Sequence, residues 1–216
     1  MRRTLLALAA AAMVIAVAVY SLGARWQEVR QQRAVGVNAE QIFRSPAGFV
    51  AGNPNGDVSV VAFYDANCPY CRQGAPALAK LIAEDGQVRL VLRRLPLLGA
   101  DSESAARVKL ATMAQGKYFE LYQRLFTEPG RATKDKAIRI AGELGLDTAR
   151  LERDIQNPSI DGALAETTGL ARALGVRRVP FYLVGDRVLG EGTDDLYAEL
   201  TARVAEIRAH GCRTAC

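Results

Sequence analysis

Histidine is nearly absent from this chain of 216 residues, and the single one, His210, lies close to the end of the sequence. This scarcity argues against a histidine-rich metal site and against a hydrolase that uses a Ser-His-Asp triad. Aromatic residues are also few, at 6% of the sequence, and no block of like charge is interleaved with them. Binding to nucleic acid therefore has little support.

The rest of the composition is that of a globular protein. Half of the residues are apolar and 24% are charged, which excludes wholesale disorder, and the length suffices for one large or two small domains. The formal net charge of +5 predicts a mildly basic surface. The four cysteines fall in two close pairs, Cys68 with Cys71 and Cys212 with Cys216, and these pairs are the candidates for chemistry.

The first 24 residues have the pattern of a targeting segment. Arg2 and Arg3 precede an uncharged, apolar run over residues 4–24, which as a helix would span about 31 Å, close to the thickness of a hydrocarbon core. We interpret the run either as an uncleaved inner-membrane anchor or as a signal peptide cleaved after Ser21-Leu22-Gly23. Both interpretations export the rest of the chain to the periplasm or cell envelope, where paired cysteines usually form disulfides.

Strand and helix signals alternate along the first half of the exported part. Residues 25–50 are polar and predict a helical stalk or linker. The β-branched and aromatic run Val58–Tyr64 is typical of a strand buried on both faces, and a helix is predicted from Cys68 to about Glu84. A second strand is predicted over Val88–Leu92.

The second half begins with a long helical block. Between residues 101 and 175 the sequence shows helical periodicity and no convincing strand. Strand signals return over Val179–Val184 and Arg187–Leu189, and the Gly185-Asp186 dipeptide between them predicts a hairpin. We therefore predict an α/β fold in two parts with an inserted all-helical domain and an N-terminal hydrophobic helix: residues 1–24 (leader), 25–50 (stalk), 51–100 and 176–210 (α/β domain), 101–175 (helical insertion) and 211–216 (cysteine-containing tail).

The segment Cys68-Pro69-Tyr70-Cys71 lies where the buried strand gives way to a helix. A sulfur at a helix N-terminus faces unpaired backbone N–H groups and the positive end of the helix dipole, so we expect Cys68 to be the nucleophile. Pro69 suits the first helical turn, where its missing N–H has no partner to lose. Cys71, one turn further on, can reach back to Cys68 and resolve a mixed disulfide.

Two other interpretations of this cysteine pair remain open. It could be an inert structural disulfide, or half of a zinc site that Cys212 and Cys216 complete from the far end of the chain. The change from strand to helix at the first cysteine favours redox chemistry over both.

Together with Val179-Pro180 and the helical block between them, the segment Phe63–Cys71 resembles the DsbA-like branch of the thioredoxin superfamily. The likeness covers roughly residues 40–210 and is strongest to periplasmic thiol-disulfide oxidoreductases of the DsbA, Com1 and ScsC type. It implies a thioredoxin-like fold and a cis peptide bond between Val179 and Pro180, beside the disulfide. There the Val179 backbone stays free to pair with an extended substrate. An ordinary trans proline at a sheet edge is the alternative.

Some positions depart from the family pattern. Thioredoxins and many relatives have a buried acid six residues before the first cysteine, where this chain has Ala62. Asp65 is the nearest carboxylate and a candidate for handling protons, with a capping or loop role as the alternative. Strongly oxidising relatives often have histidine between the cysteines. Tyr70 at that place can donate a hydrogen bond to a thiolate but supplies no positive charge.

The tail contains the second cysteine pair. Cys212 and Cys216 follow Gly211, and an oxidising compartment favours a local disulfide between them. A thiol relay to the active site and a metal site are the alternatives.

These observations predict an exported enzyme, a thiol-disulfide oxidoreductase that oxidises protein thiols. The expected partners are cysteine-containing protein substrates, a membrane redox partner that recycles the cysteine pair and, if the leader is uncleaved, the membrane itself. No dissociable cofactor and no metal is expected. The alternatives are a disulfide isomerase or reductase, and a non-catalytic thiol protein that binds copper or a partner during assembly of an envelope metalloprotein. The predicted roles are nucleophile and resolving thiol (Cys68, Cys71), tuning (Pro69, Tyr70, Asp65) and substrate binding (Val179, Pro180).

Overall fold

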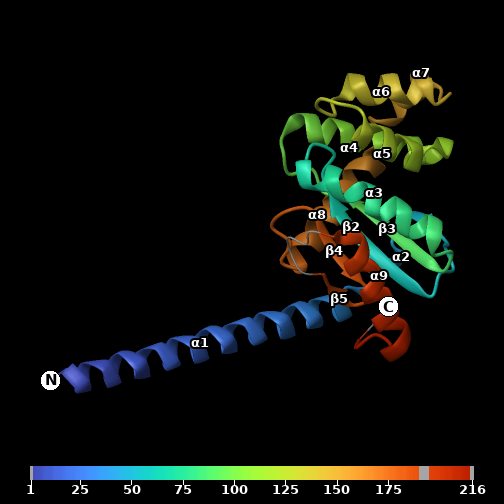
Figure 1. Ribbon diagram of the computed structural model, residues 1–216. Coiled ribbons are helices and arrows are strands. Elements are labelled where there is room, and N and C mark those ends of the chain that lie inside the picture. The colour runs from blue at the N-terminus through green and yellow to red at the C-terminus, as the bar shows by residue number, and fades with distance from the viewer. Residues whose placement is uncertain (1, 190–194, 215–216) are drawn as a thin grey trace.

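The computed structural model describes residues 2–189 and 195–214, with the backbone alone over residues 2–12 (Figure 1). The elements, in chain order, are α1 (Arg2–Val37), α2 (Ala39–Arg44), β1 (Phe49–Gly52), β2 (Val58–Tyr64), α3 (Pro69–Glu84), β3 (Val88–Arg94), α4 (Ala100–Thr112), a 3-10 turn (Met113–Gln115), α5 (Tyr118–Thr127), α6 (Lys134–Glu143), α7 (Thr148–Asp154), α8 (Pro158–Ala173), β4 (Phe181–Val184), β5 (Arg187–Val188) and α9 (Leu196–His210).

The strands form one mixed sheet in the order β1-β3-β2-β4-β5. Only β2 and β3 run parallel in this sheet, and the other pairs of described strands are antiparallel. All residues of β2 are buried, and they alternate between two cores: Val60 and Ala62 face one of them, and Val61 and Phe63 face the other. The central position of β2 explains why its sequence is an unbroken apolar run.

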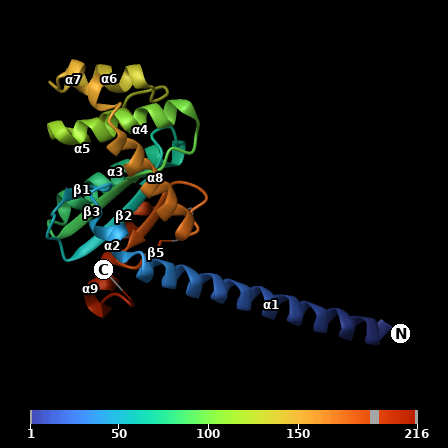
Figure 2. The same cartoon turned by 180° about the vertical axis from the view of Figure 1, so that it is seen from behind.

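Helices cover both faces of the sheet. On one face α3 and α9 pack through Leu78 and Leu81 and through Leu200 and Val204. On the other face lie α2, with the buried Ile42, and the C-terminal half of α8 (Figure 2). This three-layer arrangement is the predicted thioredoxin-like α/β fold.

The inserted helices α4–α7 gather beyond one end of the sheet, around a core of their own (Figure 1). The insertion is less separate than its predicted boundaries of 101–175 indicate. Helix α8 belongs to both units, because Ile160 lies in the helical core while Leu170 packs on the sheet. Helix α5 likewise sends Tyr118 and Tyr122 into the core beneath the sheet. Packing therefore joins the insertion to the α/β domain along two helices.

Helix α1 is continuous across the predicted border between leader and stalk, and most of its length extends away from the body (Figures 1 and 2). Its apolar side chains from Met13 to Val29 are exposed, whereas Val35, near its end, is buried against the sheet. In the part of the chain that the structure describes, no helix is both long and apolar enough to cross a membrane. The predicted anchor covers residues 4–24, and the side chains of its residues 4–12 lie outside the described part of the chain.

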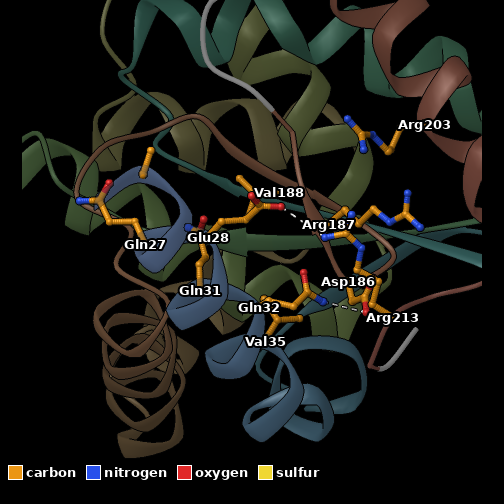
Figure 3. A pocket seen from close by; sticks show the side chains of 11 residues that line it. Gln27, Glu28, Gln31, Gln32, Val35, Asp186, Arg187, Val188, Arg203 and Arg213 are labelled. Atoms are coloured by element: carbon orange, nitrogen blue, oxygen red, sulfur yellow. Dashed lines mark hydrogen bonds and ion pairs between the residues drawn. The ribbon is translucent and has the colours of Figure 1, made fainter. Parts of the chain in front are cut away.

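The end of α1 is attached to the β4–β5 turn and to the tail. The Gln32 amide donates a hydrogen bond to Asp186 at 2.9 Å, and the Thr214 hydroxyl donates to the same carboxylate oxygen at 2.9 Å. A polar cavity of about 410 Å³ lies between α1 and β5, with Glu28, Arg187 and the other side chains of Figure 3 around it.

The structure corrects two predicted boundaries. β1 begins within the predicted linker 25–50 and pairs antiparallel with β3 at the edge of the sheet. It ends at Gly52, which has a φ of +70° and lies so close to β3 that a Cβ there would be 2.7 Å from the Val88 carbonyl. β3 is two residues longer than predicted because it continues through Arg93 and Arg94, which are both buried.

A buried hydrogen bond of 2.7 Å joins the hydroxyls of Tyr64, at the end of β2, and Tyr118, in α5. We expect Tyr118→Phe to lower the free energy of unfolding by about 1–3 kcal/mol, because it leaves the Tyr64 hydroxyl buried without its partner. The double variant Tyr64→Phe/Tyr118→Phe should recover part of this loss, because both polar groups are then absent. Urea unfolding of the single and double variants tests this, and additive losses would contradict it.

Candidate dithiol active site

The first turn of α3 positions both cysteines. Cys68 is the N-cap residue, and its Sγ accepts a hydrogen bond of 3.4 Å from the Cys71 N–H, while Pro69 occupies the first turn. Both sulfurs are free thiols, so the structure describes the reduced form of the pair. The geometry is the one predicted, with the first sulfur at the helix N-terminus facing a backbone N–H.

The fold brings the second predicted part of the site to the first. The Cys68 thiol donates a hydrogen bond of 3.3 Å to the carbonyl of Val179. The peptide bond between Val179 and Pro180 is cis, as the resemblance implies. Both residues precede β4, which begins at Phe181 rather than at the predicted Val179. Their backbone therefore lies beside the reactive sulfur and outside the strand pairing.

The two cysteines differ in their surroundings. Burial raises the pKa of the Cys71 thiol well above its ordinary value, and the neighbouring Cys68 adds to this effect. Burial also raises the pKa of the nearby Tyr182 hydroxyl. Cys71 therefore stays protonated in the reduced form, and forming its thiolate requires a compensating interaction. Tyr70, by contrast, is 68% exposed, and its side chain lies at the surface beside the pair.

Asp65 is buried, and each of its carboxylate oxygens accepts two hydrogen bonds. Oδ1 accepts from the Asn67 N–H and the Ser102 hydroxyl, both at 2.7 Å. Oδ2 accepts from the Leu97 and Leu98 N–H groups at 2.8 and 2.9 Å. These four donors occupy the acceptor sites of both oxygens and tie the carboxylate to the surrounding loops and to α4. This geometry favours the loop role of Asp65 over the predicted role in handling protons.

Asn67 and Arg72 connect this loop to the helical insertion. The Asn67 side chain exchanges two hydrogen bonds with the backbone of Ala132, of 2.7 and 3.0 Å. The Arg72 guanidinium donates to the carbonyls of Glu128 and Gly130 at 2.7 and 3.2 Å. A groove of about 490 Å³ lies between these elements, next to the cysteine pair, and its lining residues are Asn67, Pro69, Arg72, Gln73, Pro129, Gly130 and Arg131.

Two buried cations beside the site, Arg94 and Lys109, were not predicted from the sequence. Lys109, on α4, is 1% exposed, and its Nζ lies 4.2 Å from the centre of the Tyr64 ring. Burial lowers the pKa of Lys109 to about 7, and the nearby Arg94 contributes to this, while Asp65 and Cys71 oppose it. A sequence signal for Lys109 exists, because it lies at helical spacing from the buried Ala105 and Thr112, on the inner face of α4.

The tail lies at the opposite end of β4 from the cysteine pair. Cys212 is disulfide-bonded, and its predicted partner, Cys216, lies outside the described residues. A Cβ at Gly185, in the β4–β5 turn, would be 2.7 Å from the Cys212 Sγ. From Gly185 to Val179 the chain runs six residues, or ~20 Å if extended. This separation favours a tail disulfide that is independent of the active site over a thiol relay.

A family model shows to which family the chain belongs, because the model of the DSBA-like thioredoxin domain matches residues 59–200. The chain belongs to this family. Members of the DSBA-like family are thiol-disulfide oxidoreductases.

Solved structures agree with this assignment. A thioredoxin-like oxidoreductase from Silicibacter pomeroyi DSS-3 is 38% identical, with a TM-score of 0.75 over 80% of this chain and 98% of that one. The thiol-disulfide exchange protein α-DsbA2 from Wolbachia pipientis is 26% identical, with a TM-score of 0.75 over 82% and 95%. A linker-deletion mutant of ScsC from Proteus mirabilis is 22% identical, with a TM-score of 0.80 over 93% and 92%, and shows a likeness of fold alone.

The curated relatives are longer proteins. The Na(+)/H(+) antiporter NhaA 3 of Salinispora tropica is 28% identical over 177 residues, which are 78% of this chain and 27% of the antiporter. The chain thus spans about a quarter of the length of the curated relatives that it matches.

We expect Lys109 to make stability rise between pH 7 and pH 9. Folding lowers its pKa from 10.5 to about 7. Over this interval the unfolded chain therefore binds a proton that the folded chain does not, and stability increases by about 2–3 kcal/mol. Above pH 9 the raised pKa of Cys71 acts in the opposite direction. Urea unfolding from pH 6 to pH 9 measures the rise. Lys109→Met should remove it, and equal slopes in the two proteins would contradict this account.

Proposed function

We propose that the protein is an exported thiol-disulfide oxidoreductase that oxidises cysteine thiols of other proteins to disulfides. The observation that carries the proposal is the position of the Cys68 Sγ, which lies between the N–H of Cys71 and the carbonyl of Val179. The N–H at the helix N-terminus stabilises the negative charge that develops on this sulfur when the disulfide of the pair is reduced. Stabilising the reduced form makes a cysteine pair a stronger oxidant.

The reaction begins with the disulfide form of the pair. A substrate thiolate attacks the Cys68 Sγ, the bond between Cys68 and Cys71 breaks, and the Cys71 Sγ leaves with the electron pair and takes a proton. A second substrate thiolate then attacks the substrate sulfur of the mixed disulfide and releases Cys68 as a thiolate. The substrate has lost two electrons, which the cysteine pair passes on to a membrane redox partner.

The backbone at Val179 and the groove beside Pro69 are the proposed substrate sites. In the reduced form the Val179 carbonyl accepts a hydrogen bond from Cys68. Once the Cys68 sulfur is part of a mixed disulfide it has no proton to donate, and the carbonyl can accept from an N–H of an extended substrate. The groove between Pro69 and Arg131 offers space for side chains next to this backbone.

Helix α1 supports a second candidate, a disulfide isomerase that works as an oligomer. Its projecting part exposes large apolar side chains, among them Met13, Tyr20 and Trp26. A second copy of the helix would bury these side chains. Light scattering on the purified full chain, together with refolding of a substrate with scrambled disulfides, distinguishes an oligomeric isomerase from a monomeric oxidase. A copper-binding protein without turnover would instead retain copper and leave reduced substrates unchanged.

The proposed roles of the two cysteines are tested by separate substitutions. We expect Cys68→Ser to abolish oxidation of a reduced protein substrate, because it removes the attacked sulfur. Cys71→Ser should accumulate mixed disulfides between Cys68 and substrates, because Cys71 can no longer attack Cys68 and free a substrate whose second thiolate is out of reach. Non-reducing gels of envelope extracts detect the adducts. The control is Cys212→Ser/Cys216→Ser, which should keep turnover nearly intact. Adducts absent from Cys71→Ser, with activity retained in Cys68→Ser, would contradict the assignment.

Tyr70 offers a test of how the pair is tuned. We expect Tyr70→His to raise the reduction potential by about 30 mV, a tenfold change in the equilibrium with glutathione, because an imidazole beside Cys68 stabilises the thiolate of the reduced form. Tyr70→Phe, which keeps the ring and removes the hydroxyl, is the matched control. A histidine variant whose potential equals that of the phenylalanine variant would exclude this electrostatic explanation.

A further inference from the structure

Two buried cations, Lys109 of α4 and Arg94 of β3, pack against the rings of Tyr64 and Tyr118, which form an aromatic layer near the cysteine pair. Each is 1% exposed. The Lys109 Nζ lies 4.2 Å from the centre of the Tyr64 ring, and the Arg94 guanidinium carbon lies 5.7 Å from the centre of the Tyr118 ring. The hydroxyls of these two tyrosines are hydrogen-bonded to each other. Like charges thus share one water-poor layer, an arrangement that is costly unless an anion compensates it.

No carboxylate in the described part of the chain compensates these charges by hydrogen bonding. Asp65, the carboxylate that favours the charged form of Lys109, already accepts four hydrogen bonds from its own loop, from the loop after β3 and from Ser102 of α4. The Nε and Nη2 atoms of Arg94 are buried, and they have no hydrogen-bond partner among the described residues. The layer therefore suits an anion that forms only during part of a reaction cycle.

The Cys71 sulfur meets this description. It belongs to the same core as Tyr64 and Tyr122, and its charged form favours the ammonium form of Lys109. An interaction between two charges is mutual, so the ammonium favours the thiolate to the same extent. The other groups that act on Lys109 are Arg94 from β3, which opposes the ammonium, and Asp65 from the loop after β2, which favours it.

We propose that Lys109 is the electrostatic partner of Cys71. Lys109 stabilises the Cys71 thiolate when the disulfide opens, and it supplies the proton that this sulfur takes. Lys109 acts through Cys71 and touches no substrate, so it is a positioning residue. The inference rests on the proposed thiol-disulfide exchange and adds the group that handles its proton. Ala62 occupies the place where the family resemblance leads one to expect a buried acid for this task.

Protons and electrons balance when the disulfide between Cys68 and Cys71 opens. A substrate thiolate attacks Cys68 Sγ, the disulfide breaks, and the electron pair of the broken bond stays on Cys71. The Lys109 ammonium then gives up one proton, and the products are a Cys71 thiol and a neutral Lys109 amine. Reoxidation starts with a disulfide of the redox partner, which the Cys68 sulfur attacks to form a mixed disulfide. The Lys109 amine then takes the proton back from Cys71, the Cys71 thiolate attacks the Cys68 Sγ, and the partner's sulfur leaves with the electron pair of the broken bond. A group that both gives and accepts this proton needs a pKa near neutral pH, and burial lowers that of Lys109 to about 7.

The test is the rate at which glutathione reduces the oxidised full-length protein between pH 5.5 and pH 9. The rate constant is expressed per glutathione thiolate, so that ionisation of the attacking thiol does not contribute. We expect the wild-type rate constant to fall about tenfold as pH rises through 7, because Lys109 loses its charge. In Lys109→Met it should be low and independent of pH. Lys109→Arg should stay high across the range, because a guanidinium keeps its charge.

Lys134→Met is the matched control, because Lys134 is an exposed lysine at the start of α6, away from the cysteine pair. It should keep the wild-type profile. A folded Lys109→Met protein with the wild-type profile would overturn the inference. If the methionine variant does not fold, Lys109→Arg decides, and a rate constant that still falls through pH 7 overturns it. Failure of the wild-type pair to exchange with glutathione at any pH would overturn the proposed function itself.

Discussion

The carboxylate of Asp65 is the contact on which the geometry of the site depends. Its four hydrogen bonds join three segments: its own loop after β2, the loop after β3 at Leu97 and Leu98, and Ser102 in the first turn of α4. From the same loop Asn67 reaches the backbone of Ala132. The start of α3, where the reactive sulfur lies, is thereby fixed to the sheet and to the helical insertion together. Asp65, with all its acceptor sites used, therefore holds these segments in position. The free-energy cost of burying its carboxyl group is offset by these hydrogen bonds.

Much of this arrangement is encoded locally. The apolar run of β2 and the Cys68-Pro69 start of α3 predict a strand that delivers a sulfur to a helix N-terminus, and the structure confirms this. What the sequence could not reveal is the environment of each charged side chain. Arg94 and Lys109 are of residue types that usually lie at the surface. Although Lys109 falls at helical spacing from buried residues of α4, the tyrosines that surround both cations come from other elements. β1 escaped prediction for a related reason, because four residues beside a glycine carry too little periodicity to indicate an edge strand.

The buried cations also show how stability and chemistry oppose each other in this fold. A lysine in the core weakens the folded state at neutral pH, since the unfolded chain holds its proton more tightly. An apolar side chain of similar size would remove that cost. The aromatic layer partly compensates it, because the faces of the Tyr64 and Tyr118 rings attract cations. A fold that keeps such a group beside its reactive thiols sacrifices some stability for control of a proton.

The attachment of α1 to the β4–β5 turn has a consequence for association. β5 is the last described strand of the sheet, and an open strand edge offers unpaired backbone groups to any extended chain. The final turns of α1 lie beside this edge, with Gln32 bonded to Asp186, and the tail reaches the same carboxylate through Thr214. Two segments from opposite ends of the chain thus shield one edge of the sheet. Protection of that edge against adventitious strand pairing depends on both segments staying docked.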